Sequence, residues 1–300
     1  MSAIPASDAR KPVSRDGDAR TSLLLAAAIG LGWLTIHVGA IFFWRWSAGS
    51  VLLAIPVILV QAWLSTGLFI IAHDCMHGSL VPGRRGINTV VGTLCLAAYA
   101  GLSYRALFPK HHAHHAAPGT ADDPDFHAGE PRRAGPWFFR FFLGYYTHAQ
   151  ILRITVAAIV YMLLGAPLLN IVLFWAVPAL LALVQLFLFG TYLPHRHEDT
   201  PFADAHNARS NALSPLVSLM TCFHFGTYHH QHHLSPRTPW WRLPSSIGGR
   251  YRGIDPRSGF RRAPCRKHFG RQPSRRRPVA GTLHHVGQRR RQASHGQPPR

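Results

Sequence analysis

The chain has 300 residues, of which 47% are apolar and only 15% are charged, and its formal net charge is +20. This composition suits one membrane-embedded domain better than two soluble ones. The four cysteines form no CxxC pair and no spaced framework, which argues against zinc fingers and against a disulfide scaffold. Residues 1–21 form a polar N-terminal tail, and the apolar run after it is too long for a signal-peptide core, so we expect no cleavable signal peptide.

Four apolar segments are each close to the ~20 residues that a helix needs to cross a bilayer. They cover roughly 22–44, 51–71, 150–166 and 168–193, and a break at 165–167 separates the last two. Helices buried in a soluble core are the alternative, but the lengths favour membrane spans. The predicted fold is an all-α integral membrane domain over residues 22–244, with about four transmembrane helices.

A fifth apolar stretch, at about 88–108, is interrupted by Gly92, Gly101 and Ser103. It starts after the histidine-rich segment at 73–77 and ends before the histidine-rich segment at 111–115. If all the histidine clusters build one site, they lie on one side of the membrane, so this stretch should dip in and return or lie in the interface. That side is rich in basic residues, whereas the short 45–50 loop carries only Arg45, and the positive-inside bias predicts a cytoplasmic cap. The basic residues are Arg10, Lys11, Arg15, Arg20, Arg84, Arg85, Arg105 and Lys110.

Residues 136–148 are aromatic with one charge. Because Trp and Tyr favour the headgroup layer, an interfacial helix in the membrane plane is one interpretation. The other interpretation is that residues 136–148 form the start of the third membrane span.

Residues 245–300 carry 15 Lys and Arg against one acidic residue, Asp255, so most of the net charge belongs to this tail. Its richness in Arg, Gly, Pro and Ser predicts disorder. A frame-shifted or read-through end is the hypothesis we favour, and attraction to anionic lipids is the alternative. Nucleic acid is not an expected partner of such a membrane protein.

Ten of the 21 histidines fall in three clusters, HDCMH at 73–77, HHAHH at 111–115 and HHQHH at 229–233. Positions i, i+3 and i+4 share one helix face, so each cluster can aim two or three imidazoles at one point. Imidazole is the commonest transition-metal ligand. Structural zinc takes four ligands, usually including thiolate, whereas eight imidazoles suit two irons with positions left for O₂. The acidic Glu-x-x-His motif of bundle-core di-iron sites does not occur in the spans.

Eight predicted metal ligands follow from this spacing, namely His73, His77, His111, His114, His115, His229, His232 and His233. His195, which directly follows the fourth span, is the predicted ninth ligand, and His206 is its runner-up. His112 and His230 are turned away by about 100°. Carboxylates commonly orient metal-bound imidazoles, and ordinary loop charge is the alternative for these acids. The candidates for such a supporting role are Asp74, Asp122, Asp123, Asp125, His206 and His224.

The sequence that flanks the histidine clusters indicates a particular family more specifically than the clusters themselves do. The segments LFIIAHDCMHGS at 68–79, PGTADDPDF at 118–126, FGTYLPHR at 189–196, HNARS at 206–210 and 222–244 resemble the bacterial beta-carotene ketolases. That family lies within the integral-membrane di-iron desaturases and hydroxylases. The likeness runs from about residue 22 to 244.

This resemblance implies oxidation of the C4 methylene of a β-ionone ring to a ketone by two O₂-dependent hydroxylations. Beta-carotene would become echinenone and canthaxanthin, and zeaxanthin would become astaxanthin. The implied cofactors are two iron ions with O₂ as co-substrate. The implied partners are a carotenoid dissolved in the lipid bilayer and an electron donor such as reduced ferredoxin, at the bacterial inner membrane.

Two other classes of protein remain open from the sequence. One is a sister di-iron enzyme, either a fatty-acyl desaturase or a carotenoid ring hydroxylase. The other is a non-enzymatic metal-binding membrane protein, although a transporter would want ionisable groups within its spans and these have almost none.

Overall fold

The computed structural model describes residues 15–246, and the basic tail lies outside the described residues apart from its first two positions. Within this range the chain is helical and contains no strand. The α-helices are α1 Arg15–Phe43, α2 Ala48–His77, α3 Arg85–Ala100, α4 Tyr104–Ala116, α5 Ala134–Tyr145, α6 His148–Leu163, α7 Leu168–Ile171, α8 Val177–Phe187, α9 Leu193–His195, α10 Pro215–Cys222, α11 Phe225–Leu234 and α12 Leu243–Ser246.

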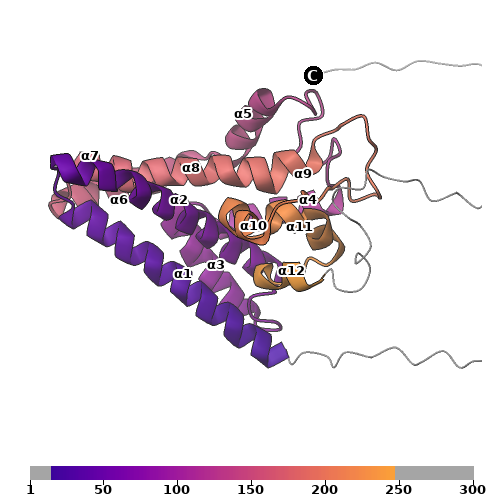
Figure 1. Cartoon of the computed structure of the whole chain (residues 1–300), viewed down its shortest axis with the longest axis horizontal. Coiled ribbons are helices and arrows are strands. Elements are labelled where there is room, and N and C mark those ends of the chain that lie inside the picture. The colour runs from indigo at the N-terminus through magenta and orange to yellow at the C-terminus, as the bar shows by residue number, and fades with distance from the viewer. Residues whose placement is uncertain (1–14, 247–300) are drawn as a thin grey trace, which may run out of the picture. The chain divides into compact units, whose positions relative to one another are not determined.

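Three helical elements are long and apolar enough to cross a membrane, namely α1, α2 and the continuous run Leu168–His195. In Figure 1 all three begin or end near α7 on the left; α2 and the run Leu168–His195 extend toward the helices α4, α9 and α11, whereas α1 extends to the lower right, below α12. They correspond to the expected spans at 22–44, 51–71 and 168–193. Helix α1 begins earlier than the expected boundary at residue 22, because its first turns pack on the end of the described chain. Asp18 pairs with Arg242 at 2.9 Å, and the indole of Trp241 donates to Ser22 Oγ at 3.0 Å.

The run Leu168–His195 contains two π-helical turns, Val172–Ala176 and Leu188–Tyr192. Each is followed by a proline, Pro178 and Pro194. A proline cannot donate to the carbonyl four residues earlier and its ring crowds that carbonyl, so a widened turn there relieves the clash. The second turn changes the direction in which the following residues face, just before His195.

Helix α6 covers the third expected span, but with 16 residues it is not by itself among the helices long enough to cross a membrane and reaches that length only together with α5. Its first turn lies beside Ala100 at the end of α3, and it ends near α7. Asn170 of α7 accepts from the indole of Trp46 at 2.8 Å and donates to the carbonyls of Ile41 and Trp44, at the opposite end of α1. The chain therefore crosses between the two ends of the bundle four times, in α1, α2, α6 and Leu168–His195.

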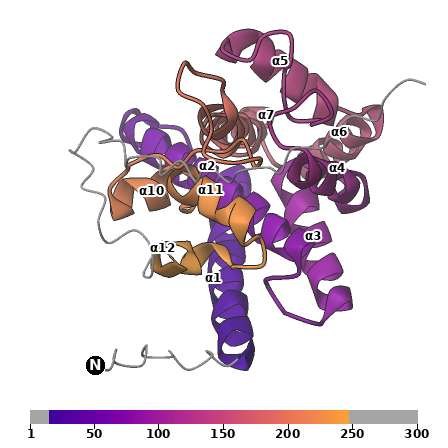
Figure 2. The ribbon, with the colours of Figure 1, turned by 90° about the vertical axis from the view of Figure 1, so that its right-hand side faces the viewer.

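Helices α3 and α4 form the dipping segment expected at 88–108. They meet at an angle of 101°, and the bend is visible in Figure 2. Gly101 allows it with φ +62°, and Gln150 and Arg153 of α6 donate to the carbonyls of Ala100 and Gly101 at 2.9 and 2.8 Å. His111 of α4 lies 2.7 Å from His77 between ring nitrogens, so the pair returns to the end of the bundle from which it started. This geometry is compatible with the expected segment that dips in and returns.

Helices α5 and α6 are also bent, by 77°. The aromatic segment is therefore not a straight lower end of α6, and its own helix lies across that direction, as the in-plane interpretation requires. Trp137 is fully buried, whereas Phe139 and Leu143 are each 65% exposed on the outer face.

We expect Gly92→Ala to destabilise the protein by about 1–3 kcal/mol, the usual cost of overpacking. Gly92 lets α3 approach α2, and a Cβ there would lie 2.3 Å from Tyr104 Cε2 and 3.1 Å from Cys75 Cβ. Gly86 of the same helix has nothing within 4 Å of such a Cβ, so Gly86→Ala is the matched control and should be neutral or slightly stabilising. Thermal unfolding of the detergent-solubilised variants measures both, and equal midpoints would contradict the packing argument.

Candidate metal centre

The three histidine clusters come from three helices that end at the same place. We call the three clusters box one (residues 73–77), box two (111–115) and box three (229–233). Box one lies in the last turns of α2, box two lies on α4, and box three lies on α11. His195 joins them from the end of the Leu168–His195 run and is fully buried. The structure therefore brings all nine predicted ligands together, including the ninth.

The nine imidazoles divide into two groups, in each of which the ligand atoms lie within 4.8 Å of one another. We call them the five-histidine group and the four-histidine group. The first contains His73, His77, His111, His115 and His232, and the second contains His114, His195, His229 and His233.

The spacing of the ring nitrogens suits metal coordination. The Nε2–Nε2 distances are 2.7 Å for His77 and His111, 3.1 Å for His115 and His232, and 2.8 Å for His195 and His229. Two nitrogens that bind one ion at right angles, each about 2.1 Å away, lie about 3 Å apart. The buried histidine cluster is thus compatible with a metal site.

Burial keeps the imidazoles of the 229–233 cluster that belong to the two groups in the form that binds metal. Burial, and after it the neighbouring imidazoles, lower the pKa of His229, His232 and His233 well below the ordinary value of 6.5. A neutral ring offers a lone pair, whereas a protonated ring offers none.

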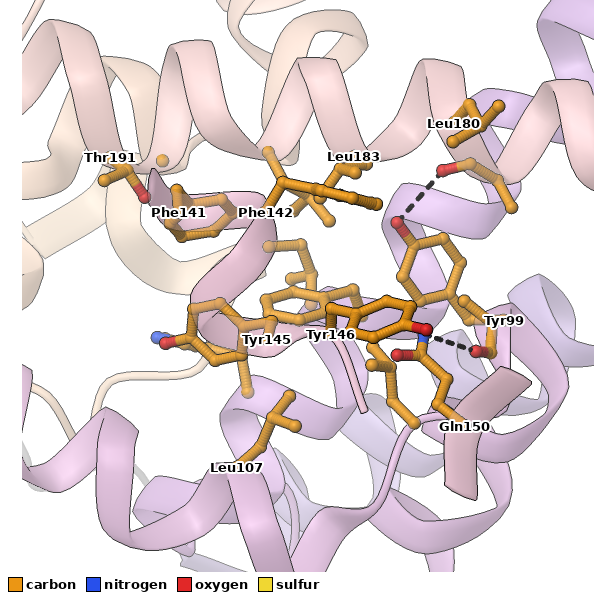
Figure 3. A pocket seen from close by; sticks show the side chains of 18 of the residues that line it. Tyr99, Leu107, Phe141, Phe142, Tyr145, Tyr146, Gln150, Leu180, Leu183 and Thr191 are labelled. Carbon is orange, nitrogen blue, oxygen red and sulfur yellow. Dashed lines mark hydrogen bonds between the residues drawn. The ribbon is translucent and has the colours of Figure 1, made fainter. Parts of the chain in front are cut away.

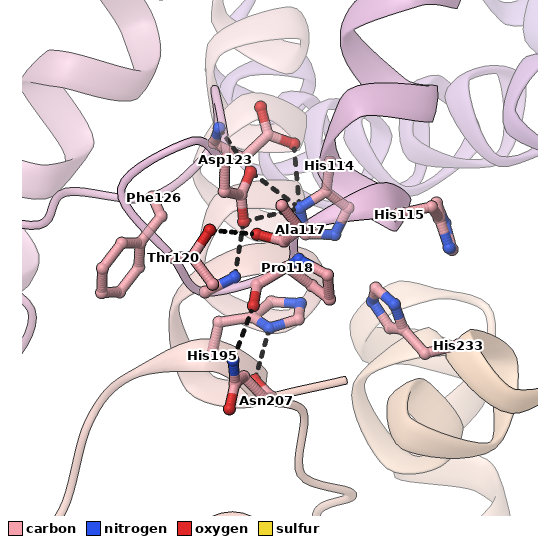
Figure 4. Close-up of polar contacts among 12 residues, drawn as sticks. His114, His115, Ala117, Pro118, Thr120, Asp123, Phe126, His195, Asn207 and His233 are labelled. Atoms are coloured by element: carbon pink, nitrogen blue, oxygen red, sulfur yellow. Dashed lines mark hydrogen bonds and ion pairs between the residues drawn. The ribbon is translucent and has the colours of Figure 1, made fainter. Parts of the chain in front are cut away.

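Two neighbours orient the four-histidine group, as Figure 4 shows. Both carboxylate oxygens of Asp123 lie 3.0 Å from His114 Nδ1, and His195 Nδ1 lies 2.8 Å from the carbonyl of Asn207. These contacts place the proton on Nδ1 and leave Nε2 free for a metal. Burial raises the pKa of Asp123, but hydrogen bonds from His114 and from two backbone N–H groups outweigh it and hold the pKa below its ordinary value.

The other candidate supporting residues have different placements. Asp74 is buried, but its carboxylate lies 3.8 Å from His73 Nδ1, and it accepts from the backbone N–H of Trp240 at 3.1 Å. Asp125 lies 3.9 Å from His114 and accepts from the hydroxyl of Tyr145. Asp122 is exposed.

The histidines expected to turn away do so. His112 is exposed with Nδ1 2.9 Å from the carbonyl of Phe108, and His230 lies 2.8 Å from Asp204. His206 also contacts Asp204 and stays outside both groups, so His195 occupies the position for which His206 was the runner-up. His224 contacts Ser218 Oγ at 3.0 Å.

We expect Asp123→Asn to weaken metal binding about 10- to 100-fold, as loss of an orienting carboxylate commonly does. Asn would keep one acceptor for His114 but lose the charge. The measurement is the iron retained after dialysis against a graded series of chelator concentrations. Asp122→Asn removes an exposed neighbouring carboxylate and is the control, so equal retention in the two variants would contradict the assigned role.

A strained link sets the position of box three. Phe223 and His224 connect α10 to α11 with φ of +46° and +73°, in the left-handed region that costs about 1–2 kcal/mol per non-glycine residue. Phe223 is buried, stacked on Trp63 at 4.8 Å. Its ring occupies the space that Gly67 leaves open, because a Cβ on Gly67 would lie 2.7 Å from it. Packing of this ring holds the strained link in place.

Sequence reasoning missed Asn207, Tyr145 and the π-helical turns. Only the π-helical turns carried a signal, because the two prolines mark them; Asn207 acts through its backbone carbonyl, and the contact of Tyr145 with Asp125 joins distant segments.

A cavity of about 460 Å³, whose lining is mainly apolar, reaches the histidines. Figure 3 shows Phe141, Phe142 and Tyr145 of α5 on one side and Leu180 and Leu183 of α8 on another. Lining residues recur every three or four positions of the long helical run, from Leu168 to Thr191. At 1.5 Å per residue that stripe is about 35 Å long.

The outer part of the cavity is open to the surroundings. Leu168 and Leu180, which line it, are 58% and 56% exposed, and Ile151 of α6 is 44% exposed. The inner part is lined by Thr191 and by six of the nine histidines, among them His73, His111 and His114. The cavity thus joins the apolar flank of the bundle to the histidine cluster.

The sequence profile of the fatty acid desaturase family matches residues 49–156 and 145–246, which include all nine clustered histidines. The chain belongs to the fatty acid desaturase family. Within it, the chain is 50% identical over 226 residues to a beta-carotene ketolase of Paracoccus sp. strain N81106, covering 75% of this chain and 92% of the relative. A beta-carotene ketolase of Paracoccus sp. strain PC1 is 48% identical over 80% of this chain and 98% of its own.

More distant relatives carry the same kind of name. A beta-carotene ketolase of Haematococcus lacustris is 39% identical over 70% of this chain and 67% of the relative, and a zeaxanthin 4-ketolase of Chlamydomonas reinhardtii is 37% identical over 223 residues. The resemblance to beta-carotene ketolases is confirmed.

Proposed function

We propose that the protein is a membrane oxygenase that converts the C4 methylene of a β-ionone ring to a ketone, with beta-carotene as substrate and zeaxanthin as a further one. The observation that carries this assignment is the 50% identity to a beta-carotene ketolase over 92% of that protein. The nine clustered histidines and the long apolar cavity supply what such a reaction requires.

The two histidine groups would each hold one iron ion. Five imidazoles from α2, α4 and α11 would bind one ion, and four from α4, α11 and the end of the long helical run would bind the other. Five- and four-fold ligation leaves positions for O₂. When bound, the two ions supply the activation of O₂ needed to break an allylic C–H bond, which no acidic or basic side chain can do.

The cavity would hold the substrate by its shape and apolarity. A carotenoid dissolved in the bilayer can enter through the exposed flank at Leu168 and Leu180 and slide one ring toward the histidines. Phe141 and Tyr145 of α5 cover the inner part, where they exclude water from the reacting carbon. The protein's own work is ligation, placement of the ring and exclusion of water.

The overall change is a four-electron oxidation of one carbon. Each hydroxylation consumes one O₂, two electrons and two protons, inserts one oxygen atom into a C–H bond and releases one water. The second hydroxylation gives a gem-diol, which loses water to leave the ketone. The sequence has no GxGxxG and no P-loop, so we infer that the electrons come from a separate donor such as reduced ferredoxin.

We infer that the histidine end faces the cytoplasm of a bacterial inner membrane. Arg84, Arg85, Arg105 and Lys110 lie in the connections and helices at that end, whereas the α1–α2 turn at the other end carries Arg45. This asymmetry supports the orientation. It also gives an acidic electron carrier a surface of opposite charge.

Expression in a bacterium that makes beta-carotene tests the proposal. Echinenone and canthaxanthin, identified by chromatography and mass, are the expected products. A 3-hydroxylated carotenoid would point instead to a ring hydroxylase, and an altered fatty-acyl profile to a desaturase. No oxidised product from iron-loaded protein would contradict an enzymatic role.

A further inference from the structure

A second, separate set of metal-binding side chains lies on the outside of the histidine cluster. Asp204, His206 and His230 present ligand atoms that all lie within 4.8 Å of one another. One carboxylate oxygen of Asp204 lies 3.1 Å from His206 Nδ1, and the other lies 2.8 Å from His230 Nε2. None of the three belongs to the five- or four-histidine group.

The donor set is that of a transition-metal site with open positions. Two imidazoles and one carboxylate bind Zn²⁺ in hydrolytic enzymes and Fe²⁺ in oxygenases, with water completing the shell. The side chains of His206, Asp204 and His230 are 38%, 37% and 17% exposed, so an ion and its water ligands can reach them from solvent. Slight burial raises the pKa of Asp204, but hydrogen bonds from His230 and His206 outweigh it and lower the pKa to about 2.

The three side chains come from two segments that both serve the four-histidine group. Asp204 and His206 belong to the connection between α9 and α10, and the next residue, Asn207, orients His195 through its carbonyl. His230 belongs to α11 and follows His229 directly. The ring of His206 lies 6.3 Å from that of His233, between centroids.

We propose that Asp204, His206 and His230 bind one divalent transition-metal ion of the zinc type, distinct from the two in the nine-histidine cluster. Such an ion links the connection that orients His195 to the helix that carries His229 and His233. It stabilises the geometry of the four-histidine group from outside and takes no part in the oxidation.

Cobalt(II) binding to the full-length, untagged, iron-loaded protein tests this site without reference to catalysis. The probe is Co²⁺, whose visible absorption reports its coordination, with bound cobalt and iron counted together by elemental analysis after equilibrium dialysis. We expect Asp204→Ala and His206→Ala each to bind one equivalent of cobalt fewer than the wild type, with loss of the corresponding absorption bands. His127→Ala, which removes another partly exposed histidine, is the control and should bind as the wild type does.

The iron count in the same samples shows whether the nine-histidine cluster is intact. Asp204→Asn keeps the shape of the side chain and removes its charge, so it serves where the alanine variants lose iron, and it too should lose the one equivalent. If Asp204→Asn and His206→Ala both bind as much cobalt as the wild type with the same spectrum, the three residues form only a hydrogen-bonded contact and the proposal is wrong. Because the readout is metal binding, this outcome is independent of whether the protein makes a ketone.

Discussion

His232→Ala is expected to abolish ketone formation, with a fall of at least about a hundredfold. Loss of a residue that hydrogen-bonds to a metal ligand already lowers metal affinity or activity 10- to 100-fold. Loss of the ligand itself should lower activity further. His232 is 1% exposed, its Nε2 lies 3.1 Å from His115 Nε2, and its ring lies 4.6 Å from that of His73. It therefore sits at the centre of the five-histidine group, where no neighbouring side chain can replace it. Keto product per cell and iron per purified protein are the two measurements.

His114→Ala makes the same test in the other group and should also lose both product and iron. His112→Ala is the matched control, because His112 lies in the same box but is exposed. Its Nδ1 lies 2.9 Å from the carbonyl of Phe108, and its ring contacts those of Phe108, His77 and His111. The control should reach the membrane and act nearly as the wild type does. Wild-type turnover in His232→Ala or His114→Ala would refute the ligand assignment.

Ala179→Phe should stop conversion of beta-carotene while a one-ring substrate with about half the polyene length, such as retinal, is still oxidised. Ala179 lines the cavity on α8, where its carbonyl accepts from the hydroxyl of Tyr99 at 3.1 Å. It lies twelve residues before Thr191, or about 18 Å along the helix. A benzyl group there would obstruct a long rod and leave the inner cavity free. We expect at least a tenfold loss for the long substrate, equivalent to about 1.4 kcal/mol.

Leu181→Phe provides the comparison. Leu181 is two residues further along the same helix, is 41% exposed and does not line this cavity. It should leave both conversions unchanged. Equal loss of the long and short substrates in Ala179→Phe would mean damage to the histidine cluster, and no loss of either would show that the cavity does not hold the polyene.

The sequence predicted the membrane helices and eight of the nine clustered histidines because both depend on regular spacing, whereas His195 was predicted from its place directly after the fourth span. Apolar length marked the spans, and the i, i+3, i+4 pattern separated His111, His114 and His115 from His112. The dip of α3 and α4 followed from parity, since box one and box two had to meet. Each of these features follows from the sequence of a single helix or from the number of times the chain crosses the membrane.

Other features depend on contacts between distant segments, which no local pattern encodes. Asp123 and Asp122 are adjacent in sequence, yet one is buried against His114 and the other is exposed. The fold of the loop decides between them. Likewise Asn207 orients His195 through a backbone carbonyl, a role that any residue type could fill and that its side chain does not reveal.

The cavity meets the histidine cluster at one end only, and this has a consequence for a substrate with two identical ends. Only one ring of beta-carotene can lie at the histidines while the remainder of the molecule occupies the stripe from Thr191 toward Leu168. Oxidation of the second ring then requires the molecule to withdraw and return turned end for end. A diketone would therefore need two separate visits, and the monoketone would be a released product that competes with fresh carotene for readmission. The balance between the two pigments in a cell would follow from their relative concentrations in the lipid.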